Sequence, residues 1–406
     1  MQGQPLGNAL VVGGCGFMGH HLVKALLDDP TTDKVSVFSR NPKENRYPGA
    51  TYYAGDITSF DNVSILLEKV KPCVIFHVAS PDPYADPPSH APFQKVNVDG
   101  TANLLTCASA APSVVAFIFT SSLTVYPYDK NGEIFNADET HPVLSGPVTS
   151  KNPYPESKSV ADAMVRAANN PPSRECQIDG CSHSHLRTAC MRIPGIYGEG
   201  DENVTLLGLW MASWGLWIFQ LGDNVTLYDP IYVGNAVFGH ILAAKALLSE
   251  ESSSGETPDK ASGEAFNITD DKPSPFWWYM HKFYRFGGYN VTPRNTWVVP
   301  TWLIMMVGWI AEWAYWFMFL GKRRPQILMR SKLEHLCKTR TFDVGKAKRV
   351  LGWKRKIEVD DAIESSVRWA LAELAKGSGS GKVKVEGVEN VGEVIEVGSL
   401  NGKFRN

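Results

Sequence analysis

The sequence lacks a cysteine framework and any strong excess of one charge. Its seven cysteines are scattered over 406 residues without a paired spacing, so we expect a reducing compartment. The 40 lysines and arginines nearly balance the 42 aspartates and glutamates, which leaves a formal net charge of −2. Because nucleic-acid binding usually needs a basic excess, the sequence predicts no nucleic-acid partner.

Signals for export, internal repetition and metal binding are also missing. Residues 1–14 do not show a basic region followed by a long apolar stretch, so we expect no secretory signal. We find no internal repeat. Five thiol and imidazole residues gather at Cys176, Cys181, His183, His185 and Cys190. Their spacing matches no standard zinc site, and Cys190 falls in a predicted buried strand, so we predict no metal.

Short apolar runs alternate with helical patterns through the first half of the chain. The runs cover residues 9–12, 35–38, 74–80, 115–122 and 186–193. Such alternation is typical of a parallel sheet covered by helices on both faces. A hydrophobic content of 44% is ample for a packed core. The sequence therefore predicts an α/β, Rossmann-like, doubly wound parallel sheet.

A glycine-rich loop joins the first predicted strand to a helix. The stretch VVGGCGFMGHHL contains Gly13, Gly16 and Gly19. Glycines at this spacing allow a tight turn, close approach of the backbone to a pyrophosphate, and close helix–strand packing. The first helical turn, with Phe17 and Met18, offers unpaired N–H groups to the phosphates. We predict that these five residues bind a dinucleotide.

The residues after the second predicted strand bear on the choice of cofactor. NAD-specific folds usually place an acidic residue there, which holds the ribose 2′-hydroxyl. This chain has Ser39 and Arg40 instead. Arg40 could pair with a 2′-phosphate, stack on adenine, or remain a solvated loop arginine. Asp56 could bind the adenine amino group or cap a helix. The sequence predicts NAD or NADP, with a slight preference for NADP.

Tyr154 and Lys158 stand four residues apart at the predicted start of a helix, and therefore on one face. A free phenol has a pKa of about 10, but a nearby ammonium and a nicotinium ring would both favour the phenolate. The phenol could then exchange a proton with a substrate oxygen. Upstream, Ser121 and Ser122 end a predicted strand beside the cofactor crevice. We expect Ser122 to orient the substrate and Ser121 to form the turn.

These motifs together resemble the extended short-chain dehydrogenase/reductase superfamily. The similarity is strongest to its 3β-hydroxysteroid dehydrogenase branch, and there to the fungal sterol-4α-carboxylate 3-dehydrogenases (decarboxylating). It extends from about Asn8 to Leu371. The segments that carry it are VVGGCGFMG, VIFHVASP, NVDGTANLL with Asn97, FTSSLTVY, YPESK, RIPGIYGEGD, YVGNAVFGHILA and FDVGKAKRVLGW. The main departure is Ser39, where the family usually has an acid.

The resemblance implies a role for each matching residue. Ser122, Tyr154 and Lys158 would be the catalytic serine, the proton acceptor or donor, and its activator, with Tyr154 and Lys158 also contacting the cofactor. Further cofactor contacts are expected from Ile57, Ala79 and Pro194. Residues 1–200 would form the Rossmann domain, to which later segments return. Residues 201–375 would form a smaller substrate lobe, and the Gly/Ser-rich residues 376–406 a flexible tail.

Two apolar segments favour a lipid substrate and a membrane surface. Residues 206–219 are apolar and rich in tryptophan, which suits a fused-ring lipid, although a buried core helix would read the same way. Residues 297–320 carry a single charge, Glu312, and are long enough to span a bilayer. Because later residues return to the same fold, we predict a monotopic anchor or a re-entrant helix pair near Gly308. The residues that follow, Lys322, Arg323 and Arg324, would contact anionic headgroups.

The expected activity is NAD(P)-dependent oxidation of a 3β-hydroxyl on a sterol or triterpenoid. If the substrate is a 4α-carboxysterol, carbon dioxide is lost as well. Alternatives are a secondary-metabolite triterpenoid or meroterpenoid without decarboxylation, a nucleotide-sugar enzyme, and a non-catalytic scaffold. The apolar lobe argues against the nucleotide sugar, and the intact Ser122, Tyr154 and Lys158 argue against the scaffold. The resemblance implies the cytosolic face of the endoplasmic reticulum membrane or a lipid droplet, with sterol C4-demethylation enzymes or a second copy as partners.

Overall fold

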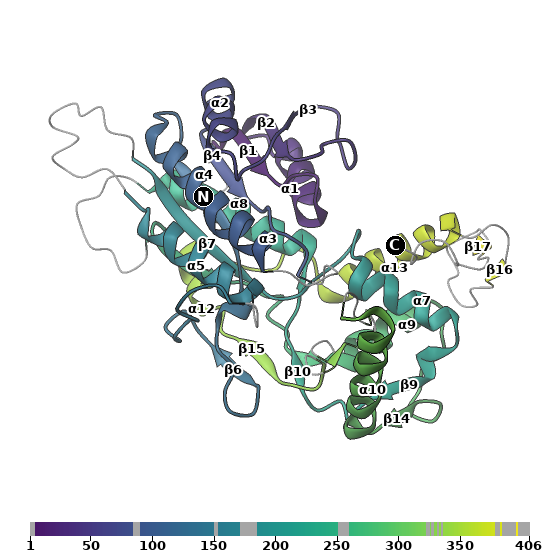
Figure 1. Ribbon diagram of the computed structural model, residues 1–406. Helices are drawn as coiled ribbons and strands as arrows, with labels where there is room; N and C mark the ends of the chain where they lie inside the picture. Colours follow the sequence, from purple (N-terminus) through teal and green to yellow (C-terminus); the bar gives the residue numbers. More distant parts are fainter. Residues whose placement is uncertain are drawn as a thin grey trace. The chain divides into compact units, whose positions relative to one another are not determined.

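The computed structural model describes two compact units of the chain (Figure 1). The described residues are 5–83, 90–149, 153–170, 185–250, 260–321, 325, 329–330, 333, 336–377, 382–383 and 395–396. The first unit comprises Met1–Pro194, Gly234–Asp271 and Phe342–Lys356, and the second comprises Gly195–Val233, Lys272–Thr341 and Ile357–Asn406. Most of the predicted tail lies outside the described residues.

A seven-stranded parallel sheet forms the centre of the first unit. Its order is β12–β7–β5–β4–β1–β2–β3, and neighbouring strands are parallel. The strands are β1 (Gly7–Val12), β2 (Thr32–Ser39), β3 (Ala50–Ala54), β4 (Val74–His77), β5 (Ala116–Ser122), β7 (Arg187–Ile193) and β12 (Glu264–Asn267). The predicted α/β Rossmann-like sheet is confirmed. Connections run in opposite directions from β1, so the crevice between the ends of β1 and β4 is a switch point suited to a ligand.

Helices cover both faces of this sheet. On one face lie α2 (Phe60–Val70), α4 (Gly100–Ala110) and α5 (Pro153–Ala167), which share a buried apolar cluster with β1, β4 and β5. On the other lie α1 (Phe17–Asp28) and α8 (Val233–Ser249). Because neighbouring side chains of a strand point to opposite faces, Phe119 joins the cluster while Thr120 meets His240 of α8.

Smaller elements complete the first unit and position parts of the predicted site. They are α3 (Ala91–Phe93), the π-helix η1 (Gln94–Asp99), the 3₁₀-helix η2 (Leu123–Val125), β6 (Ile134–Ala137) and α12 (Gly345–Leu351). Ser122 begins η2, where its hydroxyl accepts a hydrogen bond from the Thr124 N–H. The chain therefore turns sharply at the end of β5.

The second unit is smaller and contains short strands and helices. Its elements are β8 (Ile196–Tyr197), the π-helix η3 (Glu202–Leu206), α7 (Leu207–Ser213), the 3₁₀-helix η4 (Leu216–Ile218), β9 (Phe219–Leu221), β10 (Leu227–Tyr228), β11 (Ile231–Tyr232), β13 (Ser274–Pro275), α9 (Phe276–Phe286), β14 (Trp297–Val299), α10 (Thr301–Phe319), β15 (Arg340–Phe342), α13 (Val359–Gly377), β16 (Lys382–Val383) and β17 (Ile395–Glu396). The apolar residues 206–219 do not form one helix, because Gly215 turns the chain with a φ of 81° between α7 and η4.

Helix α10 is the one candidate membrane span among the described residues, by length and composition. Its side chains are largely exposed: Trp302, Phe317 and Met318 are 68%, 67% and 71% exposed, and Gly308 is its one buried residue. The predicted re-entrant pair of short helices is wrong, since α10 continues through Gly308. Glycine in a helix interior costs about 1 kcal/mol relative to alanine but keeps its N–H group, so it need not end the helix. Lys322, Arg323 and Arg324 lie outside the described residues.

Candidate active site

Lys158 lies in the second turn of α5, with its side chain directed at the end of β5. It is 2% exposed, and its Nζ donates a hydrogen bond of 2.9 Å to the carbonyl of Thr120. The ammonium also lies 4.8 Å from the centre of the Phe119 ring. Thr120 stands two residues before Ser122, so the lysine is held close to the strand end that carries the predicted catalytic serine.

Tyr154 occupies the first turn of the same helix, four residues before Lys158. Its ring packs edge-on against Phe93, with 6.0 Å between ring centroids. Ser157 Oγ donates to the carbonyl of Tyr154 at 2.9 Å, and Asn97 Nδ2 donates to Ser157 Oγ at 2.9 Å. The first turn of α5 is thus fixed to η1 through Asn97, which lies in one of the segments that carry the resemblance.

Ser122 is 5% exposed at the end of β5. Its Oγ accepts hydrogen bonds from the N–H of Thr124 at 3.2 Å and from Thr124 Oγ1 at 2.9 Å. A hydroxyl that already accepts from both groups still has its own proton to donate. Ser122 can therefore donate to a substrate oxygen. Ser121 does not form the turn as expected; its hydroxyl donates to Asp162 at 2.8 Å.

The electrostatic environment of Lys158 is unusual for a lysine. Burial lowers its pKa to about 7. Burial also lowers the pKa values of the fully buried His77 and His240 to about 3 and about 4, with the charge of Lys158 as a smaller cause. Both imidazoles are therefore neutral near pH 7 and add no positive charge beside the lysine. A lysine with a pKa near 7 can take up or release a proton at neutral pH, as the predicted activation of Tyr154 requires.

The glycine loop forms a cradle that a side chain would fill. Gly13 has a φ of 90°, and a Cβ there would lie 2.7 Å from the Cα of Ala79. A Cβ on Gly19 would lie 2.2 Å from the carbonyl oxygen of Gly13. The structure thus brings the loops after β1 and β4 together, so that Gly13 and Ala79, which were both predicted to border the cofactor, lie side by side.

The N-terminus of α1 suits a dinucleotide pyrophosphate. Gly16 begins the helix without any side-chain cap, and no acidic residue lies in its first turn. The His20 N–H is the first to bond back within the helix, to Gly16. The earlier N–H groups, including those of Phe17 and Met18, have no partner within the helix and point out of its N-terminus. The residues present therefore fit the predicted cofactor.

The residues predicted to border the adenosine part of the dinucleotide show fewer features specific to that cofactor. Ser39 ends β2 half-buried, and its carbonyl accepts from the Gly55 N–H, while Arg40 is exposed. Asp56 is half-buried and its carboxylate accepts from the Thr58 N–H at 2.9 Å. The cap of α2 is Ser59, so Asp56 is not that helix cap.

Two other predicted cofactor residues lie in loops that follow strands of the sheet. Ile57 is 7% exposed and packs against Gly100 of α4. Pro194 follows Ile193 at the end of β7, and Ile193 is paired with Ser122 of β5. Pro194 therefore lies at the same edge of the sheet as the predicted catalytic serine.

The sequence interpretation missed the buried partners of this site. Asp162 and Arg192 form a buried ion pair, with Arg192 Nη2 2.9 Å from Asp162 Oδ1. Asp162 is four residues after Lys158, and that spacing could have pointed to it, since it repeats the step from Tyr154 to Lys158. Among the residues that the structure describes, no group of three or more His, Cys, Asp or Glu side chains could hold a metal.

The fold is shared with solved structures of low sequence identity. A UDP-glucose 4-epimerase of Thermotoga maritima has 20% identity and a TM-score of 0.63, covering 90% of this chain and 99% of its own. A dTDP-glucose 4,6-dehydratase of Bacillus anthracis, solved with NAD, has 19% identity and a TM-score of 0.59, covering 89% and 96%. At this identity the likeness establishes the Rossmann-like fold with a smaller second lobe.

Sequence comparisons are more specific. Decarboxylating sterol-4-alpha-carboxylate 3-dehydrogenases of Candida albicans and Saccharomyces cerevisiae are 31% and 30% identical, over 91% and 89% of this chain and 99% and 97% of theirs. A bovine enzyme of the same name is 28% identical over 88% of this chain and 91% of its own. The model of the 3-beta hydroxysteroid dehydrogenase/isomerase family matches residues 10–300. The chain therefore belongs to the 3-beta hydroxysteroid dehydrogenase/isomerase family, as an NAD(P)-dependent oxidoreductase.

Proposed function

We propose that this chain oxidises the 3β-hydroxyl of a 4α-carboxysterol to a ketone, and that carbon dioxide is then lost. One observation carries the catalytic assignment: the buried Lys158 ammonium is held at the end of β5, between the helix that carries Tyr154 and the strand that carries Ser122. The substrate class is supported by the relatives, which are decarboxylating sterol-4-alpha-carboxylate 3-dehydrogenases.

In this mechanism, Tyr154 removes the proton of the substrate hydroxyl. The Lys158 ammonium favours the phenolate that does so, and Ser122 donates a hydrogen bond that orients the substrate oxygen. Gly13, Gly16 and the first N–H groups of α1 would hold the dinucleotide. A dinucleotide held there would supply the acceptor for the hydride that leaves carbon 3 of the sterol.

Decarboxylation follows from the position of the new ketone. With a carboxylate on carbon 4, the bond between carbon 4 and that carboxylate breaks, and its electron pair forms an enolate while carbon dioxide leaves. Water then protonates carbon 4 of the enolate, which restores the ketone and leaves hydroxide. The protein need only bind the ketone oxygen, and in this proposal the Ser122 hydroxyl does so.

The test is a turnover assay on purified protein. A 4α-carboxysterol is incubated with NAD or NADP, and formation of the reduced cofactor is followed by absorbance. The mass of the product is then measured by mass spectrometry. We expect cofactor reduction and a ketone that lacks the carboxyl carbon. A product that retains this carbon would contradict decarboxylation and favour a secondary-metabolite substrate. Absence of cofactor reduction with 4α-carboxysterols and triterpenoids alike would contradict the oxidation itself.

We also propose that the second unit rests on a membrane, with α10 in the plane of its surface. Seven of the exposed side chains of α10 are Trp302, Met306, Trp309, Ile310, Trp313, Trp316 and Phe317. Tryptophan is enriched at membrane–water interfaces. Exposed Trp297 and Val298 of β14 extend the same apolar sequence toward the N-terminus.

The chain topology supports an in-plane helix over one that crosses the bilayer. β14, just before α10, pairs with β9, and β15, after it, pairs with β10. Both flanks thus return to the second unit. The Arg330 N–H also donates to Glu312 at 2.8 Å, which brings the following segment back beside the middle of α10. A single crossing would separate these partners by the hydrocarbon core, about 30 Å.

Vesicle sedimentation tests this second proposal. We expect the full chain to sediment with vesicles of phosphatidylcholine and phosphatidylserine, and Ile310→Asp combined with Trp313→Asp to abolish this. Ile65→Asp, on the exposed surface of α2, is the matched control and should bind as the parent chain does. Equal sedimentation of the α10 variant would contradict the proposal. A lipid-free dimer that the α10 substitutions dissociate would show instead that a second copy covers this helix.

A further inference from the structure

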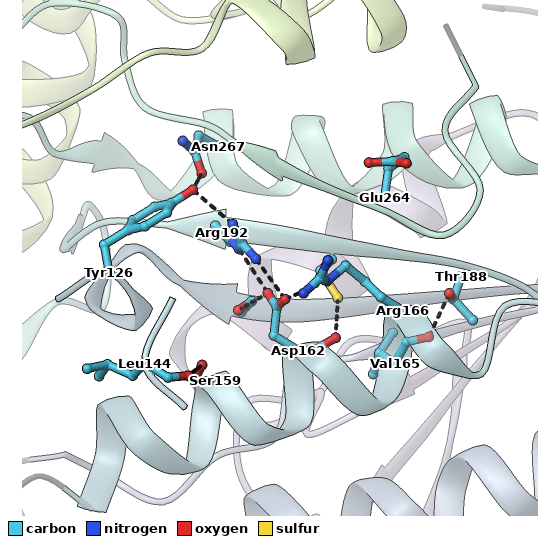
Figure 2. Close-up of polar contacts among 12 residues, drawn as sticks. Tyr126, Leu144, Ser159, Asp162, Val165, Arg166, Thr188, Arg192, Glu264 and Asn267 are labelled. Carbon is cyan, nitrogen blue, oxygen red and sulfur yellow. Dashed lines mark hydrogen bonds and ion pairs between the residues drawn. The ribbon is translucent and has the colours of Figure 1, made fainter. Parts of the chain in front are cut away.

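A buried carboxylate lies one turn beyond Lys158 on α5. Asp162 is fully buried, and its Oδ2 accepts from Ser121 Oγ at 2.8 Å and from Arg192 Nε at 3.0 Å. Its Oδ1 accepts from Arg192 Nη2 at 2.9 Å and from Arg166 Nε at 3.0 Å. Figure 2 shows the two prongs of Arg192 meeting this carboxylate, with Arg166 on its other side.

Three elements meet at this carboxylate. Asp162 belongs to α5, Ser121 to β5 and Arg192 to β7, and Ser121 and Arg192 are register partners on neighbouring strands. A fork of two parallel N–H···O bonds fixes both the distance and the orientation of its partners. The position of α5 along the sheet is therefore set at the strand residue next to Ser122.

Arg192 also contacts the segment that follows Ser122, through the guanidinium nitrogen that does not bind Asp162. Arg192 Nη1 donates to Tyr126 Oη at 2.9 Å, and Tyr126 Oη donates to Asn267 Oδ1 at 2.8 Å. Tyr126 directly follows η2, the short helix that Ser122 begins. Figure 2 shows the contacts from Asn267 through Tyr126 and Arg192 to Asp162. Both sides of Ser122 are thus connected through Arg192 and Asp162 to the helix that carries Tyr154 and Lys158.

The energetics argue for a role in geometry. Burial acts to raise the pKa of Asp162, but the hydrogen bonds and charge of Arg192 outweigh it and lower that pKa, so the carboxylate stays ionised. A buried ion pair is a weak source of net stability, because the loss of hydration offsets most of the attraction. Apolar residues in place of Asp162 and Arg192 would give the fold at least as much stability. They would not fix the orientation of α5 against β5.

We propose that Ser121, Asp162 and Arg192 are positioning residues for the oxidation: they hold the Ser122 hydroxyl in register with Tyr154 and Lys158. This inference rests on the proposed function, since it takes those three residues as the catalytic ones. None of the positioning residues is required to touch substrate. Their loss should therefore lower kcat while leaving the KM of the sterol and the affinity for NAD nearly unchanged.

The test compares Ser121→Ala and Arg192→Lys with Arg166→Ala. The control removes a bond to the same carboxylate from a side chain that is 37% exposed and belongs to α5 itself. Because a misplacement of about 1 Å can cost on the order of 100-fold in rate, we expect kcat to fall by at least about 10-fold in both test variants. KM and the NAD dissociation constant should stay within about 2-fold, and Arg166→Ala should keep the parent kcat.

Two further readouts separate positioning from a general loss of folding. If Ser121 acts through Ser122, then Ser121→Ala should cause no further loss of kcat in a Ser122→Ala background. Hydrogen exchange should quicken in residues 116–126 of Ser121→Ala and not of Arg166→Ala. This second measurement needs no substrate, so it tests the inference even if the sterol is not turned over. Unchanged kcat or unchanged exchange in Ser121→Ala would overturn the inference alone, whereas an inactive parent chain would overturn the proposed function.

Discussion

The Nζ of Lys158 donates a hydrogen bond of 2.9 Å to the main-chain carbonyl of Thr120. This bond holds the end of a flexible side chain at a fixed point on the sheet, two residues before Ser122. It also keeps the amine in a buried site, where burial lowers its pKa to about 7. The position and the protonation of Lys158 can therefore be tested together.

Lys158→Met should reduce kcat by at least about 100-fold, because in the proposed mechanism the phenolate of Tyr154 loses the ammonium that stabilises it.

The Lys158→Met variant should also change the pH dependence of the free energy of unfolding. Between pH 7 and an unfolded pKa of about 10.4, the unfolded chain keeps the proton that the folded chain has lost. The free energy of unfolding of the parent therefore rises with pH across this window, by a few kcal/mol in order of magnitude.

Urea unfolding of the cofactor-free chain at several pH values measures this rise. It should be smaller in Lys158→Met and unchanged in Lys24→Met, whose lysine is exposed and paired with Asp28. Equal slopes in the parent and Lys158→Met would mean that Lys158 is not buried as described.

Tyr154→Phe should lower kcat by at least about 100-fold and leave the dissociation constant of the cofactor almost unchanged. The phenyl ring keeps the packing against Phe93, so only the hydroxyl proposed to transfer the proton is lost. Stopped-flow or steady-state absorbance gives kcat, and quenching of tryptophan fluorescence gives cofactor binding. Tyr128→Phe, on an exposed tyrosine, is the control. Retention of most activity by Tyr154→Phe would refute the role of this phenol.

Gly13→Ala should weaken cofactor binding by at least about 10-fold and destabilise the fold by roughly 1–3 kcal/mol. Its Cβ would lie 2.7 Å from the Cα of Ala79, and the backbone has a φ of 90°. Gly146→Ala separates the two causes, because Gly146 has a φ of 113° but no atom within 4 Å of the added Cβ. Calorimetry should show a loss of NAD affinity in Gly13→Ala only. An equal loss of affinity in both variants would mean that backbone strain, and not the filled cradle, weakens binding.

Ser39→Asp should move cofactor preference toward NAD. A carboxylate at the end of β2 would accept from the ribose 2′-hydroxyl and repel a 2′-phosphate. We expect the ratio of kcat/KM with NADP to that with NAD to fall by at least about 10-fold. Arg40→Ala should reduce only the NADP value if Arg40 pairs with the phosphate. If the Ser39→Asp variant keeps the ratio of the parent chain, the 2′-position of the cofactor ribose does not lie at the end of β2.

Local patterns were sufficient to predict the sheet, and they also supplied the candidate site residues, whose roles stay predictions. Apolar runs and the glycine spacing depend on neighbours within a few residues, and so does the four-residue step from Tyr154 to Lys158. The contacts of Ser121 with Asp162 and of Asp162 with Arg192 join residues 41 and 30 positions apart, and no local pattern specifies them. Of the two arrangements predicted for residues 297–320, the pair of short helices near Gly308 was wrong, because glycine weakens a helix without ending it.

Thr120 has consequences for anyone who wishes to rebuild this enzyme. Its carbonyl accepts from Lys158 of α5, and its hydroxyl lies 2.9 Å from His240 Nε2 of α8. One residue thus sets the position of the helices on both faces of the sheet. In a chimera that takes α5 from another family member, Thr120 and His240 should be transferred together with the helix. If the new helix contacted a different residue of the strand, its lysine would lie at a different position relative to the end of β5.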